Sequence, residues 1–266
     1  MTLVHYVRGF YGITAREVLR FIHQKERFIS ALVRPLMWLF IFAAGFRSTL
    51  GVAIIPPYET YILYEVYITP GLVGMVQLFN GMQSSLSMVY DREMGSMKTL
   101  LVSPLPRWFL LTAKLLAGVI VSVLQAYVFL AIAYLYGIEA PISGYVTIFP
   151  ALILSGLMLG ALGLLLSSFI KQLENFAGVM NFVIFPMFFL STALYPLWKI
   201  QESSAFLYQL SRANPFTHAV EMIRFALYGQ FDLSAFGITL ATLFIFLGLA
   251  IMGYNPRIGM MNRGKG

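Results

Sequence analysis

The sequence predicts an all-α integral membrane protein with six transmembrane helices. Three observations lead to this fold class: 59% of the 266 residues are hydrophobic, the mean hydropathy is +0.79, and the apolar residues form long segments separated by short charged or proline-containing stretches. A chain of this length cannot bury so much apolar surface in a soluble core, so a bilayer must cover the remainder. The whole chain, 1–266, is expected to form a single transmembrane domain.

Residues 12–30, which precede the first apolar segment, predict an amphipathic helix. Arg16, Arg20, His23 and Arg27 recur at spacings of four, three and four, while apolar residues gather on the opposite side. A basic face of this kind suits an interfacial helix that lies along the inner membrane surface, where anionic headgroups attract it. The pattern leaves open a solvated cytosolic helix.

Six apolar segments are long enough to cross a hydrocarbon core of about 30 Å. They are residues 32–53, 67–89, 110–136, 145–170, 176–197 and 235–254. Between the last two, residues 199–232 carry charged side chains among short apolar runs. This composition predicts an outer re-entrant hairpin of two short helices that breaks near Asn214 and Pro215, because a residue before proline favours extended backbone.

The distribution of Lys and Arg predicts that both termini are cytoplasmic. With the N-terminus inside, 14 of the 18 basic residues fall on the cytoplasmic side. Only Lys199, Arg212 and Arg224 fall on the opposite side, and Arg47 lies within a span near the outer surface. This topology explains the net charge of +7 more simply than nucleic-acid binding does, so no nucleic-acid partner is expected.

Polar residues of the second span form one helical face. Gln77, Asn80, Ser84 and Ser87 are spaced three, four and three apart. Amides at this depth avoid lipid, so the face should meet either another helix or an aqueous path. The pattern does not choose between these two interpretations.

Small residues mark the fourth span. Gly156, Gly160 and Gly163 recur at a spacing that allows a neighbouring helix to approach closely. The motif is a weak dimerisation signal, because glycine pairs are common in apolar helices. It predicts close helix packing.

The charged stretch 90–107, between the second and third spans, is the most unusual part of the chain. It contains Asp91, Arg92, Glu93 and Lys98, although only 11% of all residues are charged. Such a stretch must lie in water, where it is free to contact a soluble partner.

The sequence lacks the patterns of several other classes of membrane protein. It contains no cysteine, and its three histidines, His5, His23 and His218, have no metal-ligand spacing. The central turns of the spans lack Asp and Glu, which a proton-driven carrier is expected to have. A transporter without an ion-coupling site or an ATPase of its own must take its energy from a partner.

An integral membrane enzyme that acts on lipid-linked substrates is the alternative function. It would need polar catalytic residues clustered at one membrane face. The residues that come nearest to this are Arg212, His218, Glu221 and Arg224.

Two motifs show that the chain resembles the ABC-2 type permeases, the membrane subunits of bacterial ATP-driven exporters. The first is Arg92-Glu93-x-Gly95-Ser96-x-x-x-Leu100-x-x-Ser103-Pro104-Leu105, followed by Lys114 early in the third span. The second is Asn214-Pro215-Phe216-Thr217 with Arg224 downstream. The resemblance covers nearly the whole chain. Within the family, Ile55-Pro-Pro-Tyr-Glu-Thr60 and Ser103-Pro-Leu-Pro-Arg-Trp108 look like permeases found beside quinoprotein alcohol-oxidation systems.

The resemblance implies that residues 93–101 form a coupling helix seated in a groove of a separate ABC ATPase subunit. The residues it assigns to this contact are Arg92, Glu93, Met94, Gly95, Ser96, Met97, Leu101, Ser103 and Pro104. Charged members would pair with the ATPase, and the apolar ones would offer a small hydrophobic face. The alternative is an ordinary solvated loop.

The resemblance also implies two copies of the chain, as a homodimer around a central path lined by spans one, two and five. That path would include Gln77, Asn80, Ser84 and Ser87, and the outer hairpin with Asn214, Pro215 and Arg224 would close it. The chain itself would bind no cofactor or metal, since ATP and Mg²⁺ belong to the partner subunit. The implied location is a multi-pass position among the lipids of the bacterial inner membrane. Export is favoured by the family alone, and no residue identifies the cargo.

Overall fold

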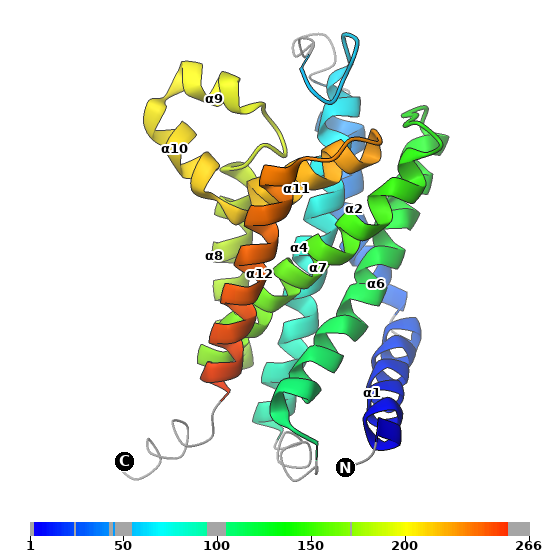
Figure 1. Ribbon diagram of the computed structural model, residues 1–266, viewed down its shortest axis with the longest axis vertical. Coiled ribbons are helices and arrows are strands. Elements are labelled where there is room, and N and C mark those ends of the chain that lie inside the picture. Colours follow the sequence, from blue (N-terminus) through cyan, green and yellow to red (C-terminus); the bar gives the residue numbers. More distant parts are fainter. Residues whose placement is uncertain are drawn as a thin grey trace.

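The computed structural model describes residues 3–23, 25–42, 45, 55–94, 105–170 and 172–254, and most of these residues lie in helices (Figure 1). In chain order the elements are α1 (Leu3–His23), α2 (Lys25–Met37), the π-helix η1 (Trp38–Phe42), α4 (Tyr64–Glu93), α6 (Arg107–Leu135), α7 (Gly144–Phe169), α8 (Leu173–Phe189), α9 (Leu197–Ser203), α10 (Ala205–Ala213), α11 (Pro215–Leu227) and α12 (Leu233–Gly253). The predicted all-α fold class is confirmed for these residues.

α4 is the central helix of the bundle. It packs against α7, α6, α11, α8 and α2, and nearly every residue from Tyr64 to Met82 is buried. Because other helices surround it, α4 can carry polar side chains that a lipid-facing helix could not tolerate. This explains why the predicted second span is long yet more polar than its neighbours.

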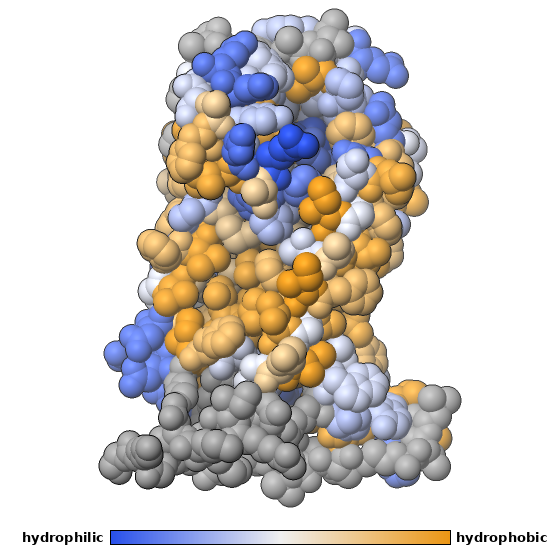
Figure 2. All heavy atoms as spheres, turned by 60° about the vertical axis from the view of Figure 1, so that its left-hand side comes forward, coloured by the Kyte–Doolittle hydropathy of each residue, from blue (hydrophilic) through white to orange (hydrophobic). Residues whose placement is uncertain are grey.

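Three helices are both long enough and apolar enough to cross a membrane: residues 108–135 of α6, and all of α7 and α12. Residues 31–41 and α8 form shorter apolar helices. Figure 2 shows an apolar band across the middle of one face of the molecule, with polar residues gathered in a hollow nearer its upper end. The chain is therefore a multi-pass membrane protein, while the number of six spans remains a prediction because most of residues 43–54 lie outside the described part.

The N-terminal helical region is longer than the predicted 12–30. α1 starts at Leu3, and α2 follows it from Lys25. α1 packs against α6, with the Tyr6 ring edge-on to Phe109 at 5.1 Å between centroids. Figure 1 shows α1 (dark blue) beside the lower part of α6. Its position relative to a membrane surface remains a prediction.

α8 ends at Phe189, so the prediction that the fifth helix extends to residue 197 is wrong. The reason is a tertiary contact. The side-chain amide of Asn214 donates to the carbonyls of Met187 and Leu190, at 2.7 and 2.6 Å, and so satisfies backbone acceptors that a longer helix would have used. The chain then turns through residues 190–196.

The predicted outer hairpin, 199–232, contains three helices where the sequence suggested two. The break at Asn214 is confirmed: its side chain accepts from the backbone of Phe216, and Pro215 occupies the first position of α11. α9 packs against α10, and Figure 1 shows this pair (yellow) projecting sideways from the bundle. Whether these helices re-enter a membrane remains a prediction.

The glycines of α7 bring that helix close to α4, as their spacing predicted. A Cβ atom added to Gly163 would lie 2.7 Å from the carbonyl oxygen of Gly81. One added to Gly81 would lie 2.9 Å from the backbone nitrogen of Gly160. The close packing is therefore within one chain, between α4 and α7.

Candidate functional site at the base of the charged loop

The charged stretch 90–107 starts in the last turn of α4. Glu93 and Met94 are exposed there, with Met94 at 62%, and Arg92 lies in the helix although its side chain is not described. Gly95, Ser96, Met97, Leu101, Ser103 and Pro104 lie outside the described residues. The structure therefore gives the base of the predicted coupling helix, and the helix itself remains a prediction.

A buried ion pair joins this base to the third predicted span. The Lys114 ammonium of α6 donates to Asp91 of α4 at 2.8 Å, and their side chains are only 6% and 7% exposed. A buried ion pair of this geometry holds its helices in one relative position, because either charge left alone would be strongly destabilising. α4 and α6 are thus fixed to each other where the charged stretch leaves α4.

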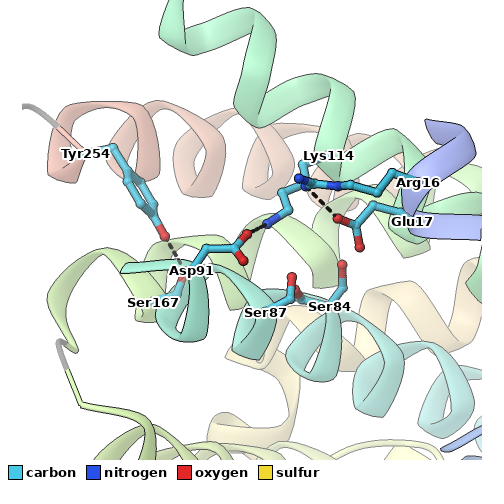
Figure 3. A network of polar contacts seen from close by, with 8 residues as sticks. All are labelled: Arg16, Glu17, Ser84, Ser87, Asp91, Lys114, Ser167 and Tyr254. Atoms are coloured by element: carbon cyan, nitrogen blue, oxygen red, sulfur yellow. Dashed lines mark hydrogen bonds and ion pairs between the residues drawn. The ribbon is translucent and has the colours of Figure 1, made fainter. Parts of the chain in front are cut away.

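Two further charges lie beside this pair, on α1. Glu17 accepts from Arg16 at 3.0 Å and interacts electrostatically with Lys114. Figure 3 shows Arg16 and Glu17 approaching the Lys114–Asp91 pair from the neighbouring helix. The N-terminal helix therefore contributes to the electrostatic environment of the same pair.

Glu93 connects the base to α8. Its carboxylate accepts a hydrogen bond of 3.3 Å from the backbone nitrogen of Leu173, the first residue of α8. An acidic group at this place also interacts favourably with the positive end of the helix dipole. One turn of α4, Asp91 to Glu93, thus contacts α6 and α8 and lies near α1. These residues are called the loop base below.

A small cavity lies next to the loop base, between α4, α6 and α7. Its lining includes Ser84, Ser85, Lys114 and Ser122, and the Ser122 hydroxyl is buried without a hydrogen-bond partner among the described residues. The cavity has room for about one water molecule. Ser84, a predicted path residue, lines this cavity.

Gln77 and Asn80, the other main predicted path residues, are buried inside the bundle. The Gln77 amide donates to the Leu152 carbonyl at 2.7 Å and accepts from the Ser155 hydroxyl, both on α7. Asn80 donates to the side chain of Gln125 on α6. Ser87 donates to the Ser84 carbonyl at 2.6 Å. Of the two interpretations left open by the sequence, this geometry favours inter-helix packing for the two amides.

At the opposite end of α4, Arg224 of α11 is the largest buried polar side chain among the described residues. It pairs with Glu221, donates to the Thr192 carbonyl at 2.8 Å, and stacks 4.1 Å above the ring of Tyr67. Tyr67 donates to the same carbonyl at 3.0 Å. Arg224 therefore holds α11, α4 and the turn after α8 together.

These contacts account for most of the cluster considered for a membrane enzyme. Glu221 and Arg224 neutralise each other, and the His218 ring hydrogen-bonds the backbone carbonyl of Arg212 at 2.9 Å. Within the described residues, no group of three or more His, Asp or Glu side chains could hold a metal ion. The cluster is arranged as a helix anchor.

Sequence reasoning found Lys114 as part of a motif but missed its partner Asp91 and the neighbouring Glu17. A signal was present: each of Asp91 and Lys114 is a charge at the end of its apolar segment nearest the charged stretch, and a helical hairpin brings these ends together. Glu17 had no such signal, because the placement of α1 depends on tertiary packing.

The fold and the loop base define a helical membrane protein whose central polar helix ends in a charged turn that is joined to α6 and α8. Residues 8–228 match the sequence profile of the family described as ABC-2 type transporter, and this chain belongs to that family. The family's permeases work with an ABC ATPase subunit.

Relatives with similar sequences are named as permeases. The chain is 28% identical over 244 residues to a putative transport permease, ycf38, of Cyanophora paradoxa, covering 85% of this chain and 80% of that protein. It is 27% identical over 207 residues to ycf38 of Porphyra purpurea, covering 77% and 68%. It is 31% identical over 170 residues to a probable multidrug ABC transporter permease, YbhR, of Escherichia coli strain K12, covering 63% of this chain and 45% of that protein. All of these names describe transport permeases.

Proposed function

We propose that this chain is the permease subunit of an ATP-driven exporter in which two copies form a translocation path and separate ABC ATPase subunits supply the energy. ATP and Mg²⁺ bind to the ATPase subunits, and the permease chain carries no cofactor. Membership of the ABC-2 family and the names of the relatives support this function.

The loop base is the observation that carries the proposal. An ATPase that pushes on residues 94–106 acts on the last turn of α4, which is tied to α6 through Asp91 and Lys114 and to α8 through Glu93. The ion pair resists separation of α4 from α6, so movement of the loop is passed to the bundle. An ordinary solvated loop would not need such an anchorage.

The proposed topology has six spans in the bacterial inner membrane and both termini in the cytoplasm. The residues between α8 and α12, with the Asn214–Pro215 break, form the outer hairpin. Arg224 anchors that hairpin to the outer end of α4. Because Gln77 and Asn80 hydrogen-bond inside the bundle, the proposed path is formed by the outward surface of α2, η1 and α8, where two copies would face each other.

The test is purification of the full chain from gently solubilised native membranes, followed by mass spectrometry of the proteins that accompany it. We expect a stoichiometric partner that carries a complete phosphate-binding loop. Glu93→Ala and Gly95→Pro should detach or uncouple this partner while membrane insertion stays normal. Glu139→Ala is the matched control, because Glu139 is an exposed carboxylate in the α6–α7 turn, at the other end of α6.

Two results would contradict the proposal. One is recovery of the chain alone under conditions that preserve known transporter complexes. The other is full transport and ATPase stimulation in both loop variants, which would make the coupling-helix assignment wrong.

A further inference from the structure

Arg34 places a cation on the outside of the helix bundle, about halfway along α4. It lies in the last turn of α2 and is exposed. Its guanidinium carbon is 4.6 Å from the centroid of the Phe79 ring, and Phe79 is only 2% exposed beneath it. Phe79 precedes Glu93, the end of α4, by 14 residues, which corresponds to about 21 Å along the helix axis. The cation is therefore remote from the polar ends of the bundle, although the count of basic residues assigned Arg34 to the cytoplasmic side.

The surface around Arg34 is apolar. Val33, Met37 and Ile41 on the same segment are 43%, 52% and 60% exposed. This surface belongs to the proposed path, which an amphiphile can enter from the bilayer. In apolar surroundings of this kind a guanidinium costs more free energy than a contact with an aromatic ring returns. None of the ion pairs between described residues includes Arg34. Another polar or anionic group is needed to satisfy this cation.

The geometry around Arg34 indicates what that group should be. The guanidinium carbon lies over the Phe79 ring, and a contact with the ring face does not use up the five N–H donors of the guanidinium. The planar edge of a guanidinium matches the two oxygens of a carboxylate or phosphate, which it can bind through parallel hydrogen bonds. The adjacent Val33 and Met37 suit an acyl chain or an apolar ring.

We propose that Arg34, supported by Phe79, binds the carboxylate or phosphate of an anionic amphiphile that reaches this surface from the bilayer. That the amphiphile is a cargo rests on the proposed function. Its binding to Arg34 does not require an ATPase. The same chemistry could come from a cargo molecule or from a resident membrane lipid. ATP hydrolysis by the partner should change the fraction of Arg34 sites that hold a cargo molecule, but not the fraction that hold a resident lipid.

The binding test uses the full chain in nanodiscs of phosphatidylcholine, which has no net charge. Spin-labelled stearic acid is the anionic probe, measured at a pH where its carboxylate is ionised, and its methyl ester is the neutral probe of the same shape. Electron paramagnetic resonance reports the fraction of each probe immobilised by the protein. We expect the acid to bind about tenfold more tightly than the ester, as a charged hydrogen bond implies.

Variants of Arg34 test whether its side chain causes the preference for the acid over the ester. Arg34→Gln should remove the preference for the acid, and Arg34→Lys should keep part of it, because lysine retains the charge without the planar edge. Arg212→Gln is the matched control, an exposed basic residue on α10, and should bind both probes as the wild type does.

The proposal is overturned if wild-type protein binds acid and ester equally, a result that needs no variant to fold. It is also overturned if Arg34→Gln keeps the preference, or if Arg212→Gln loses it to the same extent. The source is then resolved with the ATPase complex: a cargo is released on ATP addition and stimulates hydrolysis, whereas a resident lipid stays bound and leaves hydrolysis unchanged. If no ATPase partner exists, the nanodisc measurement still decides whether the site binds anions.

Discussion

Breaking the Asp91–Lys114 pair from one side should destabilise the protein more than any change to an exposed ion pair. The two side chains are 7% and 6% exposed and meet at 2.8 Å. Asp91→Asn leaves the ammonium of Lys114 buried without its direct counter-charge, and Lys114→Met does the same to Asp91. Removing one partner of a buried ion pair costs about 3–5 kcal/mol. We expect Asp91→Asn near the lower end, because Glu17 also interacts favourably with Lys114.

The assay is reversible unfolding of the detergent-solubilised chain, read by circular dichroism, on both single variants and on the double variant Asp91→Asn with Lys114→Met. Since the double variant leaves no buried charge of the pair, it should be less destabilised than either single variant. The interaction energy from the cycle should then exceed the larger of the two single losses, so it should be at least about 3 kcal/mol. Arg16→Gln is the control, because the Arg16 side chain is 44% exposed and solvent reduces such a pair to less than about 1 kcal/mol.

A functional measurement shows whether the Asp91–Lys114 pair only stabilises the fold or also passes movement of the loop to the helix bundle. In the complex with its ATPase, the double variant should retain the partner but stimulate ATP hydrolysis less in response to cargo, since α4 and α6 are no longer fixed at the loop base. The reasoning is refuted if either single variant is as stable as Arg16→Gln. It is also refuted if the double variant transports and hydrolyses ATP as the wild type does.

Three other predictions follow from the packing. Gly81→Ala should cost about 1–3 kcal/mol in unfolding measurements, because its Cβ would lie within 3.0 Å of the α7 backbone, whereas Gly178→Ala, with open space around it, should be neutral or stabilising. Asn80→Leu should destabilise by about 1–3 kcal/mol by leaving Gln125 unpaired, and adding Gln125→Leu should restore stability and leave transport intact; lost transport in a stable double variant would favour a path role. Burial raises the pKa of Tyr228 from 10.0 to about 12. The folded state then keeps a proton that the unfolded chain releases, so stability is full below pH 10 and falls between pH 10 and 12. Tyr228→Phe should make this fall shallower in a pH series of unfolding curves.

Local signals allowed the sequence to predict some elements of the fold correctly. Asn214 and Pro215 mark a helix start by chemistry that depends only on neighbouring residues, a side-chain cap followed by a fixed backbone angle. The small residues of the fourth span likewise predicted close packing, and the structure identifies α4 as the helix that approaches. Each of these signals lies within a few residues of the feature it predicts.

The predictions that failed or stayed open depend on contacts between distant residues. The end of α8 could not be predicted, because the group that satisfies its last carbonyls, Asn214, lies 24 to 27 residues further along the chain. The polar face of α4 fitted both packing and a path until the partners of Gln77 and Asn80 were known. A helical period gives the direction of a side chain but not the neighbour it meets.

The distribution of these contacts along α4 indicates which parts of the bundle can move together. Gln77 binds α7, Asn80 binds α6, and Asp91 binds α6 again at the loop base. A force on the loop is therefore expected to move α4, α6 and α7 as one body. Among the described residues, the connection to α8 at this end is weaker, a single hydrogen bond of 3.3 Å from Leu173 to the exposed Glu93. Because α8 is also proposed to face the second copy, relative movement between α8 and the three-helix body is the simplest way for the loop to open or close a path. A disulfide between cysteines introduced on α4 and α6 should then leave transport intact, whereas one between α4 and α8 should stop it.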